Sequence, residues 1–115
     1  MKISIGDRFR LLGILPQQGN IVTLRIVSDL RTALAVSEQE VKDYAVKDLG
    51  NGMISWSEVK AKGKDKEITI GEKAKDVIKD ALKASNDAGK LTVGLIPLYE
   101  RFVEGQEINA GRQRK

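Results

Sequence analysis

Four lysines recur at every second position in the middle of the chain: Lys60, Lys62, Lys64 and Lys66. Alternate side chains of an extended strand point to the same side, so this spacing predicts four ammonium groups on one face. Such a face could lie along a phosphate backbone or against an acidic protein surface. The alternative is structural, because lysines on an exposed sheet edge discourage association with another sheet.

Arg25 and Arg31 form a second candidate group of cations. They lie on the outward faces of a helix predicted from Asn20 to Leu34, where they could contact a partner. Asp29 follows Arg25 at i+4, so a structural ion pair is the default interpretation. Together with the four lysines, these arginines are the candidate macromolecule-binding residues.

The chain has no histidine and no cysteine, and this excludes several common types of enzyme site. The commonest zinc sites, thiol nucleophiles and Ser-His-Asp triads cannot be built without these side chains. Gly50-Asn51-Gly52 reads as a turn, because it lacks the Lys and Ser/Thr of a phosphate-binding loop. Carboxylate-only catalysis stays open, but we expect no enzyme, cofactor, metal site or small-molecule substrate.

The length of 115 residues and a hydrophobic content of 41% predict one small globular domain with its own core. We place this domain at residues 1–104 and a flexible basic tail at 105–115. Charged residues at Asp7, Arg8 and Arg10 interrupt any apolar core of a signal peptide. No segment has the length of a membrane span, and we expect a cytoplasmic protein.

Hydrophobic periodicity and capping signals predict the order of the elements. A short helix is expected at 7–15, with Asp7 as its N-cap and with Ile5, Phe9 and Leu12 on its apolar side. A capping box at Ser37 and Glu40 predicts a third helix that ends near Val46. The remaining expected elements are a β-hairpin that pairs 54–56 with 68–70, a long helix at 72–88 closed by Gly89, and a last helix from about Pro97 to before Gly105. The lone tryptophan, Trp56, is expected to pack under the helix at 72–88.

Three helices, a hairpin and further helices form a mainly helical α+β pattern whose order resembles winged helix-turn-helix domains. The segment from Thr32 to Val41 is similar to the turn of that motif, in which a small and an apolar residue precede a Ser cap. The segment from Glu67 to Ala74 is similar to a second wing strand that leads into a helix. This resemblance implies a winged-helix-like fold, which serves both DNA-binding and protein-docking domains.

A second resemblance covers most of residues 8–104. In these residues the chain is similar to small phage and prophage proteins of unknown function. The similarity rests on the Ile-Leu-Pro turn at 14–16, the helix that begins with Thr23-Leu24, the acidic Ser-Glu segment and the segment from Leu98 to Val103. The resemblance implies an accessory protein of a virus or mobile element. It supplies no catalytic residues.

The uneven distribution of charge favours one type of partner. Residues 1–35 carry a net charge of +3, whereas residues 36–59 carry −3 and include the predicted third helix. A helix that enters the major groove needs donors for phosphates and base edges, and this helix is acidic. We therefore expect a protein partner from host or phage; the alternative is a winged-helix regulator that binds duplex DNA. Self-association through the apolar last helix is a third possibility.

Overall fold

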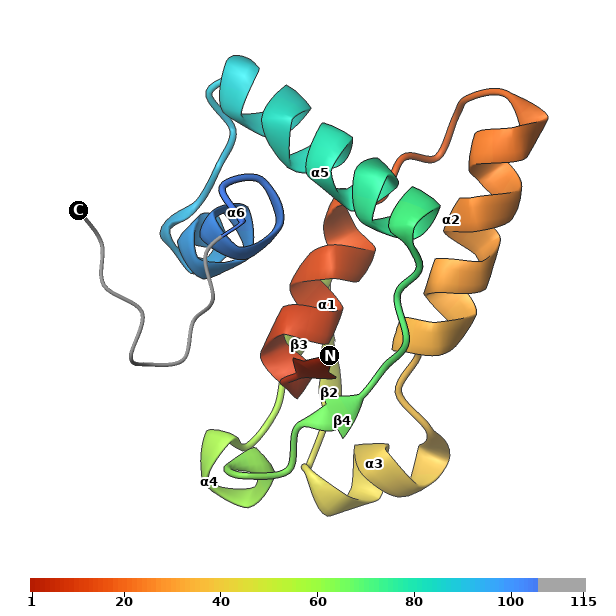
Figure 1. The fold of residues 1–115 in the computed structure, drawn as a ribbon. Helices are drawn as coiled ribbons and strands as arrows, with labels where there is room; N and C mark the ends of the chain where they lie inside the picture. Colours follow the sequence, from red (N-terminus) through yellow and green to blue (C-terminus); the bar gives the residue numbers. More distant parts are fainter. Residues whose placement is uncertain (106–115) are drawn as a thin grey trace.

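Residues 1–105 are described by the computed structural model, and they form the expected mainly helical α+β fold (Figure 1). Apart from Gly105, the expected tail at 105–115 lies outside the described residues. The elements in chain order are β1 (Lys2–Ile3), α1 (Ile5–Ile14), α2 (Ile21–Leu34), α3 (Glu38–Asp43), β2 (Lys47–Gly50), β3 (Met53–Ser55), α4 (Glu58–Ala61), β4 (Lys66–Glu67), α5 (Glu72–Asp87), η1 (Val93–Leu95) and α6 (Ile96–Phe102).

Side-chain caps set the first residue of each of the three N-terminal helices. Asn20 caps α2, and Ser37 with Glu40 forms the predicted capping box of α3, with Glu40 N to Ser37 Oγ at 3.1 Å. The first helix begins earlier than expected, because Ser4 rather than Asp7 is its N-cap. A side-chain oxygen at the cap accepts from a backbone N–H that would otherwise lack a partner.

Local backbone geometry likewise decides where two helices end. α3 ends at Asp43 rather than near Val46, because Ala45 adopts a φ of 52° that cannot continue a right-handed helix. α5 ends as expected before Gly89. Lys90 N donates to Ser85 O and Gly89 N donates to Asn86 O, the paired bonds that close a helix at a left-handed glycine.

The strands pair differently from the expected hairpin. β2 pairs with β3, and β1 pairs with β4, in two separate two-stranded antiparallel sheets. The predicted pairing of 54–56 with 68–70 is wrong, and the wing expected from the winged-helix resemblance does not form there. Asn51 and Gly52, with φ of 53° and 75°, form a tight two-residue turn. Because this turn reverses the chain directly after β2, β3 pairs with β2.

The hydrophobic core is built around α5, which packs against α1, α2 and α6 (Figure 1). Ile78 and Leu82 of α5 are fully buried there, as the helical periodicity predicts. Ile68 and Ile70 are also buried, but they follow β4 instead of forming a hairpin strand. The other buried members of this cluster are Ile3, Leu11, Leu15, Val27, Leu30, Leu34, Leu95 and Leu98.

The buried face of α1 is rotated from the expected one. Phe9 and Leu12 are only half-buried, whereas Arg8 and Leu11 are fully buried. Phe9 instead packs against Trp56, with ring centroids 5.3 Å apart. The prediction that Trp56 packs under α5 is therefore wrong, because its ring lies against α1. A Cβ added at Gly6 would meet this ring at 3.0 Å, so the glycine permits the close approach.

Candidate functional site

The four alternating lysines do not share one extended face. Lys60 lies in α4, Lys62 caps the end of that helix, Lys64 follows in a turn, and Lys66 lies in β4. Ser57 Oγ accepts from Lys60 N at 3.2 Å and starts the helical turn. Residues two apart in a helix lie on nearly opposite sides, so the alternation no longer aligns the ammonium groups. All four are exposed, and the expected lysine-striped wing is wrong.

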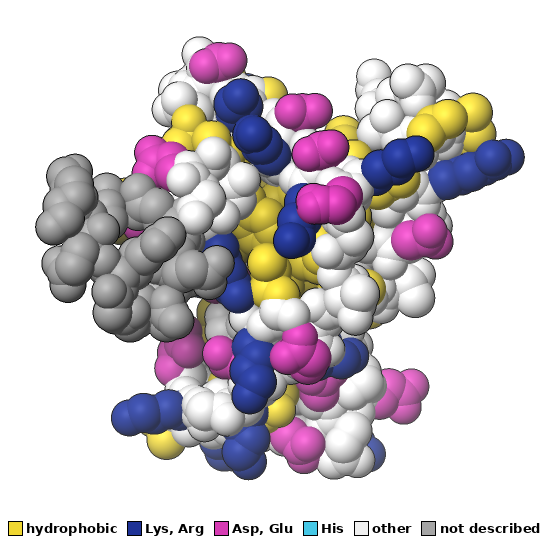
Figure 2. Space-filling model, in the orientation of Figure 1, with side chains coloured by type: hydrophobic (Ala, Val, Ile, Leu, Met, Phe, Trp, Pro, Cys, Tyr) yellow, Lys and Arg dark blue, Asp and Glu magenta, His cyan; other side chains and the backbone are white. Residues whose placement is uncertain are grey.

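Arg25 and Arg31 are exposed on α2, as expected. The default interpretation, a structural ion pair, is wrong, because no ion pair joins Arg25 to Asp29 among residues 1–105. The acidic helix α3 follows the end of α2 in the chain (Figure 1). Dark blue and magenta side chains are mixed over the visible face (Figure 2). On this face, carboxylates therefore interrupt the cations, which do not gather into one basic surface.

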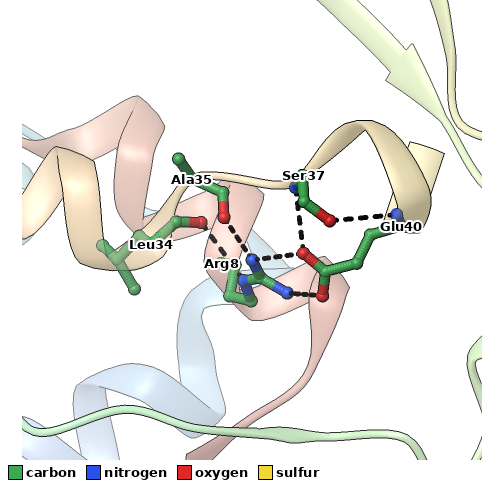
Figure 3. A network of polar contacts seen from close by, with 5 residues as sticks. All are labelled: Arg8, Leu34, Ala35, Ser37 and Glu40. Atoms are coloured by element: carbon green, nitrogen blue, oxygen red, sulfur yellow. Dashed lines mark hydrogen bonds and ion pairs between the residues drawn. The ribbon is translucent and has the colours of Figure 1, made fainter.

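A buried polar cluster centred on Arg8 holds α3 in place (Figure 3). The Arg8 side chain is 1% exposed and reaches from α1 to the end of α2 and the start of α3. Its Nε donates to Leu34 O at 3.1 Å, and its Nη2 also donates to Ala35 O. Its two terminal nitrogens bind Glu40, at 2.7 Å from Nη1 to Oε2 and 3.1 Å from Nη2 to Oε1. The sequence analysis did not predict this role of Arg8. The sequence did contain a signal for it: Arg8 lies three residues after Ile5 and three before Leu11, and this spacing puts it on the apolar side of the helix.

Glu40 is held in its charged form by this cluster. Hydrogen bonds from Arg8 lower the pKa of the Glu40 carboxyl to about 2, and the backbone N–H of Ser37 also lowers it. The charge of Lys66 adds to the lowering. Lys66 and this carboxylate therefore attract each other, which offsets part of the attraction of Lys66 for phosphate.

The hairpin formed by β2 and β3 exposes apolar side chains that the sequence analysis placed in the interior or did not single out. Leu49, Met53 and Ile54 are 58%, 61% and 41% exposed. Ile54 was expected on the buried face of a strand, and this expectation is wrong. Residues 47–54 are exposed and Ser55 is only partly covered, so both faces of the hairpin are open. We call residues 47–55 the apolar hairpin.

The sequence segment that contains the apolar hairpin, residues 36–59, is acidic. Residues 36–59 contain Glu38, Glu40, Asp43, Asp48 and Glu58 against Lys42 and Lys47. Because Glu40 is paired with Arg8, four carboxylates and two ammonium groups of this segment are left, a net charge of −2. Val59, just beyond the hairpin, is also exposed. The segment therefore combines apolar side chains with negative charge.

Two open grooves flank the long helix α5. One, of about 430 Å³, lies between α5 and the α1–α2 connection and is lined by Ile14, Pro16, Val77, Ala81 and Ala84 among others. The other, of about 410 Å³, lies between α2 and the start of α5 and includes Ile26, Leu30 and Ala74. Sequence reasoning predicted neither groove. Both have mainly apolar walls, which suit side chains of a partner.

No protein-family model, curated protein or solved structure was found to match this chain. The resemblances to phage proteins and winged-helix domains remain predictions. Among the described residues, no group of three or more carboxylates could hold a metal ion. None of the helices within residues 1–105 is long and apolar enough to cross a membrane.

Proposed function

We propose that this chain is a non-enzymatic accessory protein of the phage type that acts in the cytoplasm by binding another protein through the apolar hairpin. The observation that carries the proposal is the exposure of Leu49, Met53 and Ile54 on a hairpin with both faces open. Adjacent strand residues point to opposite faces, so Met53 and Ile54 expose apolar side chains on both sides of the hairpin, and exposed apolar surface marks interaction sites.

The energetics of the hairpin support a partner. An isolated two-stranded hairpin is marginally stable in water, and three or more strands or a packed face are normally needed. Full burial of one Leu, Ile or Met side chain contributes about 1.5–3 kcal/mol, so burying the exposed part of each would contribute roughly half of that. A protein surface placed over the apolar hairpin would supply this stabilisation.

Charge supports a protein rather than duplex DNA as the partner. A DNA-binding surface gathers Lys and Arg on one face to contact successive phosphates. Here Arg31 lies on α2 and Lys66 in β4, and the apolar hairpin carries as many acidic as basic side chains. These arrangements weaken phosphate binding and leave apolar contact with a protein as the favoured interaction.

Site-specific photo-crosslinking tests the proposal. Met53→p-benzoylphenylalanine should form a discrete protein adduct in the native cells, and Val93→p-benzoylphenylalanine, on the still more exposed Val93 of η1, should not. The adduct partner, once purified, should bind wild type and lose binding to the Met53→Ser variant. No adduct at position 53, or equal adducts at both positions, would contradict the proposal.

A duplex-DNA titration provides the second arm of the test. The proposal expects no salt-sensitive binding in fluorescence anisotropy with labelled duplex. The DNA alternative instead predicts affinity that falls steeply with salt, and a slope flattened by replacing Lys60, Lys62, Lys64 and Lys66 with Ala. That result would replace the protein-binding proposal with the DNA-binding one.

A further inference from the structure

The chain between α2 and β4 has no buried side chain. Leu34 at the end of α2 and Ile68 just after β4 are buried, but every residue from 35 to 67 is exposed or only half-buried. We call residues 36–65 the outer segment; it contains α3, β2, β3 and α4, and its two helices lie away from α5 (Figure 1). Among the described residues, no side chain that lies in the core cluster or packs against it comes from the outer segment.

The outer segment is attached to the core through α1. Arg8 binds Glu40 of α3 in the two contacts described above, and Phe9 packs against Trp56, just before α4. Within residues 1–105, no main-chain hydrogen bond joins the outer segment to the rest of the chain. An ion pair and a ring contact, from two adjacent residues of α1, therefore link it to the helical core.

Backbone hydrogen bonds connect the parts of the outer segment to each other. β2 pairs with β3, and Ser57 N, next to α4, donates to Tyr44 O, at the end of α3, at 2.8 Å. Isolated helices as short as α3 and α4 are not stable in water, and a two-stranded hairpin is marginal. Without its attachment to α1, the outer segment would therefore lose its structure as a whole.

The ring contact is the weaker of the two links. Trp56 Nε1 is buried and has no hydrogen-bond acceptor among residues 1–105. A buried donor without an acceptor carries a desolvation cost that offsets the gain from ring packing, and it regains a hydrogen bond with water when the ring is exposed. Glu40, in contrast, accepts two hydrogen bonds from the buried Arg8 side chain. The Arg8–Glu40 pair is therefore the principal attachment.

We propose that the outer segment unfolds as one unit while α1, α2, α5 and α6 stay folded, and that the Arg8–Glu40 pair is the contact that opposes this local unfolding. Segments with few buried apolar side chains open at a lower free energy than the core does. The unit includes the apolar hairpin, so the hairpin surface exists only while the outer segment is attached. The inference does not rest on the proposed function, because it concerns the attachment of the segment and not its partner.

Native-state amide hydrogen exchange on the full chain tests the separate unfolding. In wild type, the protection factors of the Tyr44 and Ser57 amides should be at least about 100-fold lower than those of α5. Leu82→Ala should lower protection in α5 by about 30-fold or more and change it in the outer segment by less than about 2-fold. The reason is that this core defect is present in both the closed and the locally unfolded form.

A milder core variant provides a second measurement. If Leu82→Ala does not fold, Ile78→Val should lower protection in α5 by about 3–10-fold and again leave the outer segment unchanged. Equal protection of the two regions in wild type would overturn the inference. A parallel loss in both regions when the core is weakened would overturn it as well.

Glu40→Gln tests the role of the ion pair. Glutamine can still accept from Ser37 N and complete the capping box, but it lacks the charge that binds Arg8. Protection in the outer segment should fall by about 10-fold or more. Protection in α5 should fall by the same factor, because the pair exists only in the fully folded form.

Glu38→Gln is the matched control, since it removes an exposed carboxylate from the same helix and should change protection by less than about 3-fold. Equal effects of Glu38→Gln and Glu40→Gln would overturn the role of the ion pair. Neither outcome depends on the photo-crosslink at position 53, so the proposed function and this inference can fail separately.

Discussion

Arg8 of α1 and Glu40 of α3 form a two-pronged ion pair across 32 residues of sequence, with contacts of 2.7 and 3.1 Å. The arginine also donates to the carbonyl oxygens of Leu34 and Ala35, which end α2. Glu40 in turn completes the capping box of α3. One side chain thus joins three helices and positions the acidic segment next to the core.

Replacing Arg8 with Met should destabilise the protein strongly. The substitution leaves Glu40 without its counter-charge and the carbonyls of Leu34 and Ala35 without this donor, so we expect a loss of about 3 kcal/mol in the free energy of unfolding. Urea unfolding followed by circular dichroism measures this. Arg10→Met is the matched control, because the Arg10 side chain is 37% exposed in its pair with Asp7 and should cost less than about 1 kcal/mol. Equal losses for the two variants would contradict the structural role of Arg8.

Stability should fall in acid because of Glu40. Its pKa is about 2 in the folded protein and 4.5 is the ordinary value, so the unfolded state binds more protons between these pH values. The stabilisation is nearly complete above about pH 4.5 and is lost as the pH falls toward about 2, by an amount on the order of 3 kcal/mol. Urea unfolding at a series of pH values should show this loss for wild type and a flatter profile for Glu40→Gln. Glu67→Gln is the control. The N-terminal ammonium lowers the Glu67 pKa, but that side chain is 64% exposed and its loss should leave the profile nearly unchanged.

Gly52→Val should disorder the apolar hairpin without unfolding the core. The φ of 75° at this position is strained for a β-branched residue, and the turn closes a hairpin with both faces exposed. Amide hydrogen exchange should show lost protection in residues 47–55 and unchanged protection in α5. Loss of protection throughout α5 would show instead that the hairpin and the core unfold as one unit.

Two leucine-to-alanine variants should differ in stability, because one leucine is in the core and the other is on the surface. Leu82→Ala removes a fully buried side chain of α5 and should cost about 2–5 kcal/mol. Leu49→Ala, on the 58% exposed side chain of β2, should change stability by less than about 0.5 kcal/mol. Thermal unfolding of both variants checks the contrast. A large loss for Leu49→Ala would mean that the hairpin side chain supports the fold itself.

The sequence predicted the features that depend on neighbouring residues. The capping box of Ser37 and Glu40 and the turn at Gly50–Gly52 involve contacts within four residues and are confirmed. The end of α5 before Gly89 is of the same kind. Such signals can be recognised in a single chain because the interacting groups are always close together.

Only the tertiary structure decided the strand partners, the role of Arg8 and the exposure of the hairpin. β4 pairs with a strand more than sixty residues earlier, and Arg8 finds Glu40 after three helices have packed. The alternation of Lys60 to Lys66 matched a strand, but a cap at Ser57 started a helical turn there instead. Met53 and Ile54 look like core residues by composition, yet they are exposed because the core is completed by other segments. Long-range pairing and burial depend on how the whole chain packs, and no local pattern of residue types specifies them.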